Sequence, residues 1–151
     1  MEEELYPVII QVTVPLPTHM IFAALTEPGS LTNWLCESAE LEPRVGGKYR
    51  FRFGGASPFE SHGTLTHFTP DVDLGFEWRA PTQFASLMNE PKPATRVYFR
   101  LADSPEGIDV TLEHIGWGSG EKWEEARSWH FHLWDEKLPQ LKAYLIRAAY
   151  G

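Results

Sequence analysis

The stretch "SWHFHLW", from Ser128 to Trp134, decides the predicted fold of this chain because it fits two structures. In a β-strand, the side chains of His130 and His132 would point to the same side and could share a metal ion. In an α-helix, the two histidines would point to nearly opposite sides, and no shared metal site could form. The stretch therefore separates a metal-dependent enzyme from a protein of another kind.

The flanking sequences favour the helix. Residues 118–127 and 135–149 are rich in helix-forming residues, and no turn signal separates them from the stretch. At about 100° per residue, one narrow sector of the helix collects the inward set: Trp123, His130, Trp134, Leu141 and Leu145. We therefore expect one amphipathic helix over Glu121–Ala148, with His130 facing inward, His132 facing solvent and no metal bound between them.

The segments before this helix change to a period of two, which is typical of β-strands. In residues 48–53 the aromatic residues Tyr49, Phe51 and Phe53 alternate with basic ones, so one face of this strand is apolar and the other charged. Strands are predicted over residues 6–14, 38–43, 45–55, 60–68, 73–80, 95–103 and 107–115. Short helices are predicted over residues 19–25 and 30–35, and one helical turn over 84–89.

This order of elements predicts an α+β fold. The chain has 151 residues, which suits one domain over residues 1–151. A curved antiparallel sheet of six to seven strands, wrapped around the long C-terminal helix, would bury the apolar surface of both, with the two short helices following the first strand.

Composition excludes several classes of protein. The formal net charge of −8 opposes binding to the phosphate backbone of nucleic acids. The single cysteine excludes an internal disulfide and is compatible with a reducing compartment. No apolar run reaches membrane-spanning length, and the start "MEEELYP" is acidic where a secretory signal would be basic. We therefore expect a cytoplasmic monomer or homodimer with no nucleic-acid or membrane partner.

Four segments resemble, in order, motifs of the SRPBCC superfamily, whose fold is the START-like helix-grip. They are "ALTEPGSLTNWL" (24–35), "EPRVGGKYRFRF" (42–53), "GTLTHFTP" (63–70) and "TLEHIGW" (111–117). Within the superfamily the motifs are most similar to the branch named after the activator of the heat-shock-protein-90 ATPase. The resemblance implies the helix-grip fold, a pocket for a hydrophobic ligand and, for this branch, a link to the stress response.

The residues also predict a pocket between sheet and helix. Aromatic residues make up 13% of the chain, more than a tight core of this size requires. In the N-terminal half of the helix Arg127 and His130 face inward, and His114 lies opposite on a strand. Polar groups there oppose dry packing, so we expect an open cavity in which Arg127 holds the polar end of an apolar ligand. The predicted ligand-binding residues are Phe51, Phe76, Trp78, His114, Trp117, Trp123, Arg127, His130 and Trp134.

Each of these residues also has an ordinary packing alternative. A histidine on an apolar face is more often a hydrogen-bonded core residue, and Arg127 can have a structural partner. Three functions are therefore open. The first is binding of a small, mostly apolar molecule; the second is a protein-interaction role, on a chaperone or another partner, with Trp129 as the exposed aromatic residue. The third is an enzyme of the cyclase, aromatase or hydrolase kind found among superfamily relatives. We assign no catalytic residue, cofactor or metal.

Overall fold

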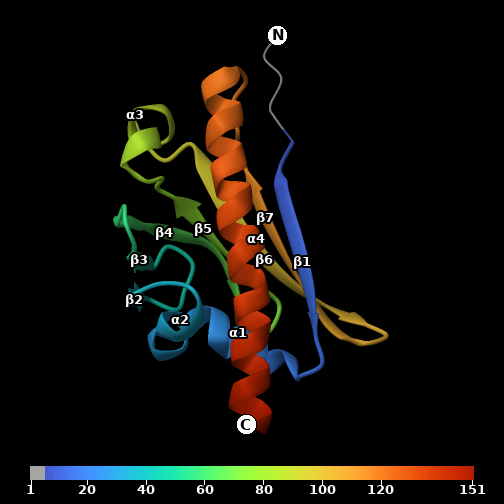
Figure 1. Ribbon diagram of the computed structural model, residues 1–151. Helices are drawn as coiled ribbons and strands as arrows, with labels where there is room; N and C mark the ends of the chain where they lie inside the picture. The colour runs from blue at the N-terminus through green and yellow to red at the C-terminus, as the bar shows by residue number, and fades with distance from the viewer. Residues whose placement is uncertain (1–5) are drawn as a thin grey trace.

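The computed structural model describes residues 6–151 and shows an antiparallel sheet gripping a long C-terminal helix (Figure 1). The elements are β1 (Val8–Val14), α1 (Thr18–Thr26), α2 (Pro28–Trp34), β2 (Ser38–Leu41), β3 (Lys48–Phe53), β4 (Phe59–Thr69), β5 (Asp73–Trp78), a 3-10 turn (Thr82–Phe84), α3 (Ala85–Met88), β6 (Thr95–Ser104), β7 (Gly107–Ile115) and α4 (Glu121–Tyr150). The predicted α+β helix-grip fold is confirmed. The acidic start, up to residue 5, lies outside the described residues.

The seven strands form one sheet in the order β1-β7-β6-β5-β4-β3-β2, and each neighbouring pair is antiparallel. Helix α4 crosses the concave face of this sheet, and α1 and α2 lie beside its C-terminal half (Figure 1). This packing follows from the sequence because the helix and the sheet each have one apolar face to bury.

The stretch Ser128–Trp134 lies within α4, as predicted from its flanks. His130 is fully buried and His132 is exposed, which confirms that the two histidines point to different sides. The inward stripe recurs every three or four residues, at Ala126, His130, Trp134, Leu138, Leu141 and Leu145. Acidic residues in the first turn and Arg147 in the last suit the helix dipole.

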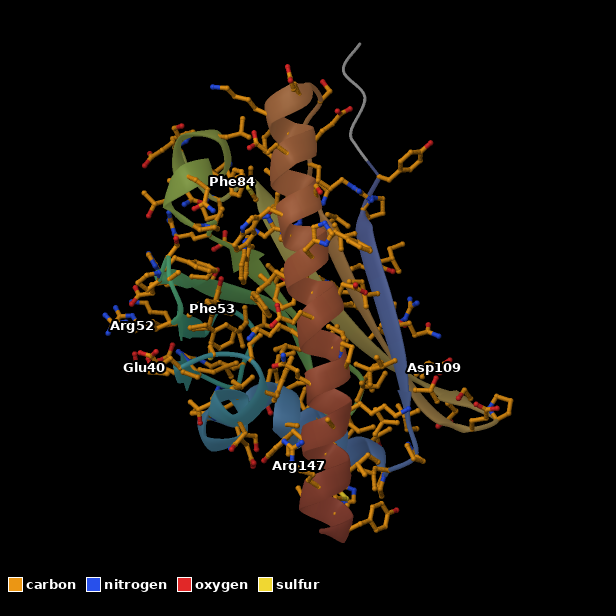
Figure 2. The ribbon with its side chains drawn as sticks, viewed as in Figure 1. Glu40, Arg52, Phe53, Phe84, Asp109 and Arg147 are labelled. Carbon is orange, nitrogen blue, oxygen red and sulfur yellow. The ribbon has the colours of Figure 1, made fainter. Side chains whose placement is uncertain are left out.

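Strand β3 shows the predicted alternation in full. Tyr49, Phe51 and Phe53 are buried, and the basic residues between them are exposed. Figure 2 shows Phe53 on the side of the sheet that faces α4, whereas Arg52 on the same strand points away from the helix. The basic row therefore lies on the outer face of the sheet, as predicted.

Strand β4 changes partner halfway along its length. Residues 59–64 pair with β3, and residues 65–69 pair with β5, with a register shift between Leu65 and His67. No described residue of β4 before Leu65 is in register with β5. One part of the sheet thus consists of β2, β3 and the first half of β4. A single short backbone ladder, between the second half of β4 and β5, joins this part to the rest of the sheet.

Candidate ligand-binding site

Two buried histidines and three buried tryptophans meet under the N-terminal half of α4. His130 comes from α4, His114 from β7 and Trp78 from β5; Trp117 follows β7, and Trp134 lies one turn beyond His130. All five residues are fully buried. The two imidazole ring centres are 5.2 Å apart. We call this set, with Phe76 beside Trp78, the His–Trp cluster.

Hydrogen bonds fix the protonation state of His130. The indole Nε1 of Trp78 donates to Nε2 of His130 at 2.9 Å. Because an indole N–H can only donate, Nε2 must be the bare nitrogen of a neutral ring. The proton is then on Nδ1, which donates to the carbonyl oxygen of Ala126 at 2.8 Å. Both ring nitrogens of His130 therefore have partners inside the protein.

His114 is neutral as well, in the opposite tautomer. The indole Nε1 of Trp134 donates to its Nδ1 at 3.1 Å, which leaves the proton on Nε2. That nitrogen donates to the hydroxyl of Thr95 at 2.8 Å, and the indole of Trp117 donates to the His114 carbonyl oxygen at 2.7 Å. The cluster thus satisfies its own polar groups without a ligand.

Burial keeps both imidazoles uncharged. It lowers the pKa of His130 to about 4. It also lowers the pKa of His114 well below its ordinary value, and the nearby His130 adds to this effect. Protonation would also turn an N–H toward an indole N–H that can accept nothing. The cluster therefore supplies neither a cation for an anionic ligand nor a proton donor at neutral pH.

The structure brings most of the predicted ligand residues together, but it fills the predicted cavity. Trp134 is 5.3 Å from Trp78 between ring centres, and Phe51 reaches the cluster through Phe76 at 5.6 Å. The expectation of an open cavity at this place is wrong. Polar groups do oppose dry packing when each is alone, but here the imidazoles and indoles pair with one another.

Arg127 lies apart from the cluster, which corrects its predicted placement, whereas Trp123 lies at the edge of the cluster with its ring centre 6.4 Å from that of Trp117. The guanidinium of Arg127 donates through Nε to the carbonyl oxygen of Tyr6 and through Nη2 to that of Pro7 at 3.0 Å. Arg127 thus connects the first turns of α4 to the residues just before β1. The ring of Trp123 covers Gly118, where a Cβ atom would be 2.4 Å from the indole nitrogen.

An open groove lies instead between α4, α2 and the loop that joins β3 to β4. Its volume is about 750 Å³. One end is apolar, with Phe53 and Phe59 from the sheet and Trp129 and Leu133 from the helix. The other end is polar, with Thr32, Asn33, Glu136, Lys137 and Gln140. Glu37 also lines the groove, but its carboxylate lies against Gly54, next to Phe53.

The groove and the His–Trp cluster share a wall of aromatic rings. The ring of Phe59 stacks on Phe53 at 4.6 Å and meets the edge of Trp129 at 5.8 Å. Behind them, Trp78 is 6.2 Å from Phe59, and His130 is 4.8 Å from Trp129. The predicted residues Trp78 and His130 therefore lie one ring away from open space.

Trp129 is a groove residue for which the sequence predicts another role. It was expected to be exposed for a protein partner, and it lies half-buried between Phe59 and Phe84. A second stripe on the helix, Trp129, Leu133 and Lys137 at intervals of four, was the signal that could have indicated the groove.

The thiol of Cys36 lines the groove but is not activated. Burial raises its pKa to about 12, and the nearby Lys137 opposes this shift only in part. Because the thiolate is the reactive form, a nucleophilic role for Cys36 is disfavoured. The groove offers shape and hydrogen-bonding groups, which suit binding.

Comparison with known proteins places the fold. The family model of the Activator of Hsp90 ATPase homolog 1-like protein matches residues 15–146. No curated protein matches the chain. Within residues 6–151, no helix is long and apolar enough to cross a membrane.

Solved structures similar to this chain include protein MLL2253 from Mesorhizobium loti, at 19% identity and a TM-score of 0.75, covering 93% of this chain and 97% of that one. The Aha1 dimer from Colwellia psychrerythraea also has 19% identity and a TM-score of 0.75, covering 93% and 96%. DynU16, a putative protein of the dynemicin biosynthetic locus, has 22% identity and a TM-score of 0.72, covering 92% and 46%.

At these identities the likeness to solved structures shows the fold alone. The family model supports membership of a family, because its match covers most of the chain, from just after β1 into the last turns of α4. The chain therefore belongs to the family of Activator of Hsp90 ATPase homolog 1-like proteins.

Proposed function

We propose that the protein binds a small, mostly apolar molecule between the sheet and the C-terminal helix, in the groove beside α4. The main support for this proposal is the set of residues that line the groove. Aromatic side chains from both layers, Phe53 and Phe59 on one side and Trp129 on the other, form an open apolar wall. Such a concave wall with a few polar groups at one end is typical of small-molecule sites.

The spacing of the groove residues sets the length and polarity of the ligand. Trp129 and Lys137 are eight residues apart on α4, which is about 12 Å at the helical rise. The ligand then has an apolar ring or chain of roughly that length and a polar group at its far end. Arg127, bonded to the backbone of Tyr6 and Pro7 just before β1, is not part of this site.

Charges at the polar end favour a hydrogen-bonding group over a bare anion. Within residues 6–151, no carboxylate lies within ion-pairing distance of Lys137. Glu136 lines the same end, however, and Glu37 lines the groove beside Gly54, so two carboxylates of the groove would repel a ligand anion that one ammonium attracts. A hydroxyl, amide or carbonyl group of the ligand can bond to Asn33 or Gln140 without this repulsion.

A fluorescent probe tests the site directly. We expect N-phenyl-1-naphthylamine, which is neutral and aromatic, to bind the wild-type protein. Replacement of Trp129 with alanine should weaken its binding about tenfold, the effect of losing ~1.4 kcal/mol of apolar contact. Phe131→Ala is the matched control, because Phe131 is an aromatic residue of α4 outside the groove.

Two results would reject the proposal. One is the absence of probe binding to the wild-type protein. The other is an equal loss of affinity in Trp129→Ala and Phe131→Ala. Native mass spectrometry of protein purified from its own host then identifies the natural ligand, because a retained molecule appears as added mass on the 17.2 kDa chain.

A second proposal, self-association, is supported by one relative. The similar protein from Colwellia psychrerythraea is described as a dimer. We propose that this chain also forms a homodimer, which sedimentation equilibrium tests as a doubled mass. A mass of 17.2 kDa that does not change with protein concentration would contradict it.

A further inference from the structure

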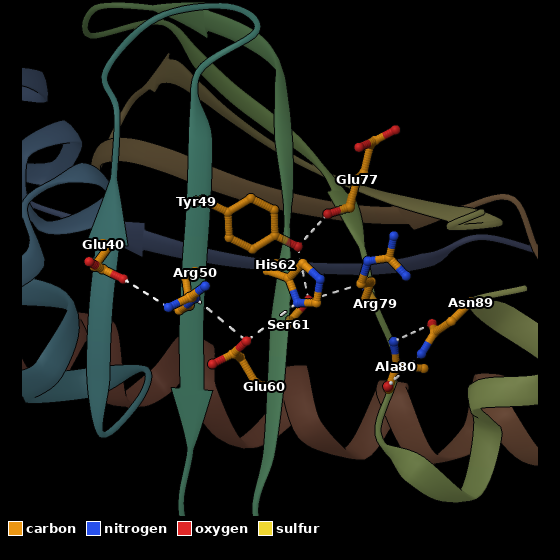
Figure 3. A network of polar contacts seen from close by, with 10 residues as sticks. All are labelled: Glu40, Tyr49, Arg50, Glu60, Ser61, His62, Glu77, Arg79, Ala80 and Asn89. Carbon is orange, nitrogen blue, oxygen red and sulfur yellow. Dashed lines mark hydrogen bonds and ion pairs between the residues drawn. The ribbon is translucent and has the colours of Figure 1, made fainter. Parts of the chain in front are cut away.

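Beyond Leu65 and Phe76 the strands β4 and β5 part, and side chains bridge the gap (Figure 3). The backbone of β5 continues to Trp78 and keeps its ladder with β6 on the other side. On the side of β4, however, its polar groups have lost their strand partner. Buried backbone groups need other partners in such a place.

A relay of three hydrogen bonds supplies them. The backbone N–H of Arg79 donates to Oγ of Ser61 at 3.0 Å, and the hydroxyl groups of Ser61 and Tyr49 are 2.8 Å apart. The hydroxyl of Tyr49 donates its one proton to the carbonyl oxygen of Glu77. Ser61 must therefore donate to Tyr49, and the relay runs from the backbone of Arg79, just after β5, to the backbone of Glu77 in β5.

Two further contacts lie where the strands part. The carboxylate Oε1 of Glu77 accepts from the backbone N–H of Thr64 at 3.2 Å and from its hydroxyl at 2.9 Å. Burial raises the pKa of the Tyr49 hydroxyl, so this group stays a donor. We call this junction, where side chains connect β4 and β5 beyond their ladder, the seam. Its polar groups are less completely paired than those of a ladder, because Nε of Arg79 is buried and has no partner among the described residues.

The part of the sheet beyond the seam carries one wall of the groove. We call residues 38–64, which hold β2, β3 and the first half of β4, the hairpin arm. Phe53, Phe59 and the loop between them belong to this arm, whereas Trp129 and Leu133 on the opposite wall belong to α4. Any movement of the arm relative to α4 therefore changes the width of the groove.

We infer that the hairpin arm moves as a unit about Thr64–Thr66, and that the Ser61–Tyr49 relay holds it closed over the groove. Outward movement breaks a few side-chain hydrogen bonds where the strands part, the ring contacts of the arm with Phe76 and Trp78, and part of the packing of β2 on α2, but no strand ladder. It also draws Phe53 and Phe59 away from Trp78, so the groove deepens toward the His–Trp cluster. The link to ligand entry rests on the proposed function; the movement itself does not.

Hydrogen exchange tests the movement without a ligand. Tyr49→Phe removes the relay and keeps the ring, so amide exchange in residues 48–64 should become about five- to tenfold faster, as expected for one net hydrogen bond. Exchange in residues 95–115 of β6 and β7 should stay unchanged. Ser61→Ala interrupts the same relay and serves as the second variant if Tyr49→Phe folds poorly.

The matched control is Tyr98→Phe. Tyr98 also donates its hydroxyl proton across strands, to Asp73 at 2.8 Å, but between β6 and β5, which are laddered. This variant should leave exchange in the arm unchanged. Equal acceleration of the arm in Tyr98→Phe, or equal acceleration of residues 95–115 in Tyr49→Phe, would overturn the inference, as would an unchanged arm.

The single cysteine reports on the groove itself. Cys36 lines the groove, and opening would hydrate its thiol and increase the reactive thiolate. Labelling by a thiol reagent should therefore be about five- to tenfold faster in Tyr49→Phe than in Tyr98→Phe. If the naphthylamine probe fails to bind the wild-type protein while exchange and labelling behave as stated, the proposed function fails and the movement of the arm stands.

Discussion

Two neighbouring residues of α4 show how differently this protein uses similar side chains. His130 lies in the His–Trp cluster, where both ring nitrogens are bonded and no space is left. Trp129, next to it, lies half-buried in a groove of about 750 Å³. Both regions are rich in aromatic rings, and both lie between the sheet and the same helix.

The comparison teaches that aromatic content does not by itself indicate a pocket. In the cluster each indole N–H meets an imidazole nitrogen or a carbonyl oxygen, so polar groups and rings pack together at no cost in unpaired bonds. At the groove, the rings of Phe59 and Trp129 pack against neighbouring rings but stay only half-buried, because both also line open space. The open site lies where no further side chains cover these aromatic rings.

The largest difference between the regions should be in stability. Trp78→Ala removes a fully buried ring and leaves Nε2 of His130 without its donor, so we expect a loss of about 3–5 kcal/mol in the free energy of unfolding. Chemical denaturation measures it. Phe131→Ala, at the partly exposed surface of α4, should change stability by less than about 0.5 kcal/mol. A loss below about 2 kcal/mol in Trp78→Ala would show that the cluster is loosely packed.

Acid should destabilise the cluster. The ordinary pKa of histidine is 6.5 and that of folded His130 is about 4, so the unfolded chain binds the proton more tightly. The contribution of His130 is fully present above pH 6.5 and is lost as the pH falls toward 4. This loss is on the order of 3 kcal/mol, and the lowered pKa of His114 acts in the same direction.

Denaturation curves at several pH values measure the acid effect. His130→Gln should reduce the dependence of stability on pH in this range, whereas the exposed variant His132→Gln should follow the wild-type curve. Carboxylates elsewhere titrate in part of the same range, so the difference between variants is the measured quantity. Identical pH curves for His130→Gln and the wild-type protein would contradict the neutral, buried state of this ring.

A smaller effect separates Arg127 from the ligand site. Arg127→Leu removes two hydrogen bonds to the start of β1, and we expect a loss of about 1 kcal/mol in stability because the side chain is partly exposed. The affinity for N-phenyl-1-naphthylamine should stay unchanged. Weaker probe binding by a folded Arg127→Leu variant would show that Arg127 is part of the ligand site.

The smallest effect concerns charge at the polar end of the groove. Lys137→Met should weaken the anionic probe 1-anilinonaphthalene-8-sulfonate about two- to fivefold, the size of an exposed charge interaction, and leave the neutral naphthylamine unaffected. Lys142→Met, on the exposed surface of the same helix and outside the groove, is the control. Equal effects of both variants would mean that only the net charge of the protein matters.

Local sequence patterns predicted most of the fold. The alternation in residues 48–53 and the stripe from His130 to Leu145 each reflect one buried face, and a buried face leaves a period in the sequence. Boundaries were less accurate: α2 begins at Pro28 rather than Ser30, because proline suits the first turn of a helix. The motifs of the helix-grip family then gave the architecture, which the family match confirms.

The candidate site could be predicted only in part. The sequence identified His114, His130 and Trp78 as neighbours under the helix, and the structure places them together. It could not show that they bond to one another, because that depends on the register of β5 and β7 beneath α4. The groove was missed because its walls come from α2, the β3–β4 loop and α4, which are distant in the chain.

The sequence by itself determined the elements, their inward faces and the family, since periodicity and motifs are local properties of the chain. Tertiary structure alone decided which polar groups find partners. Tyr49 and Ser61 look like ordinary strand residues, yet they bridge two strands that part, and Arg127 faces the backbone of β1 rather than a pocket. The physical reason is that a hydrogen bond depends on angstrom-scale placement of groups from different elements, which no local pattern encodes.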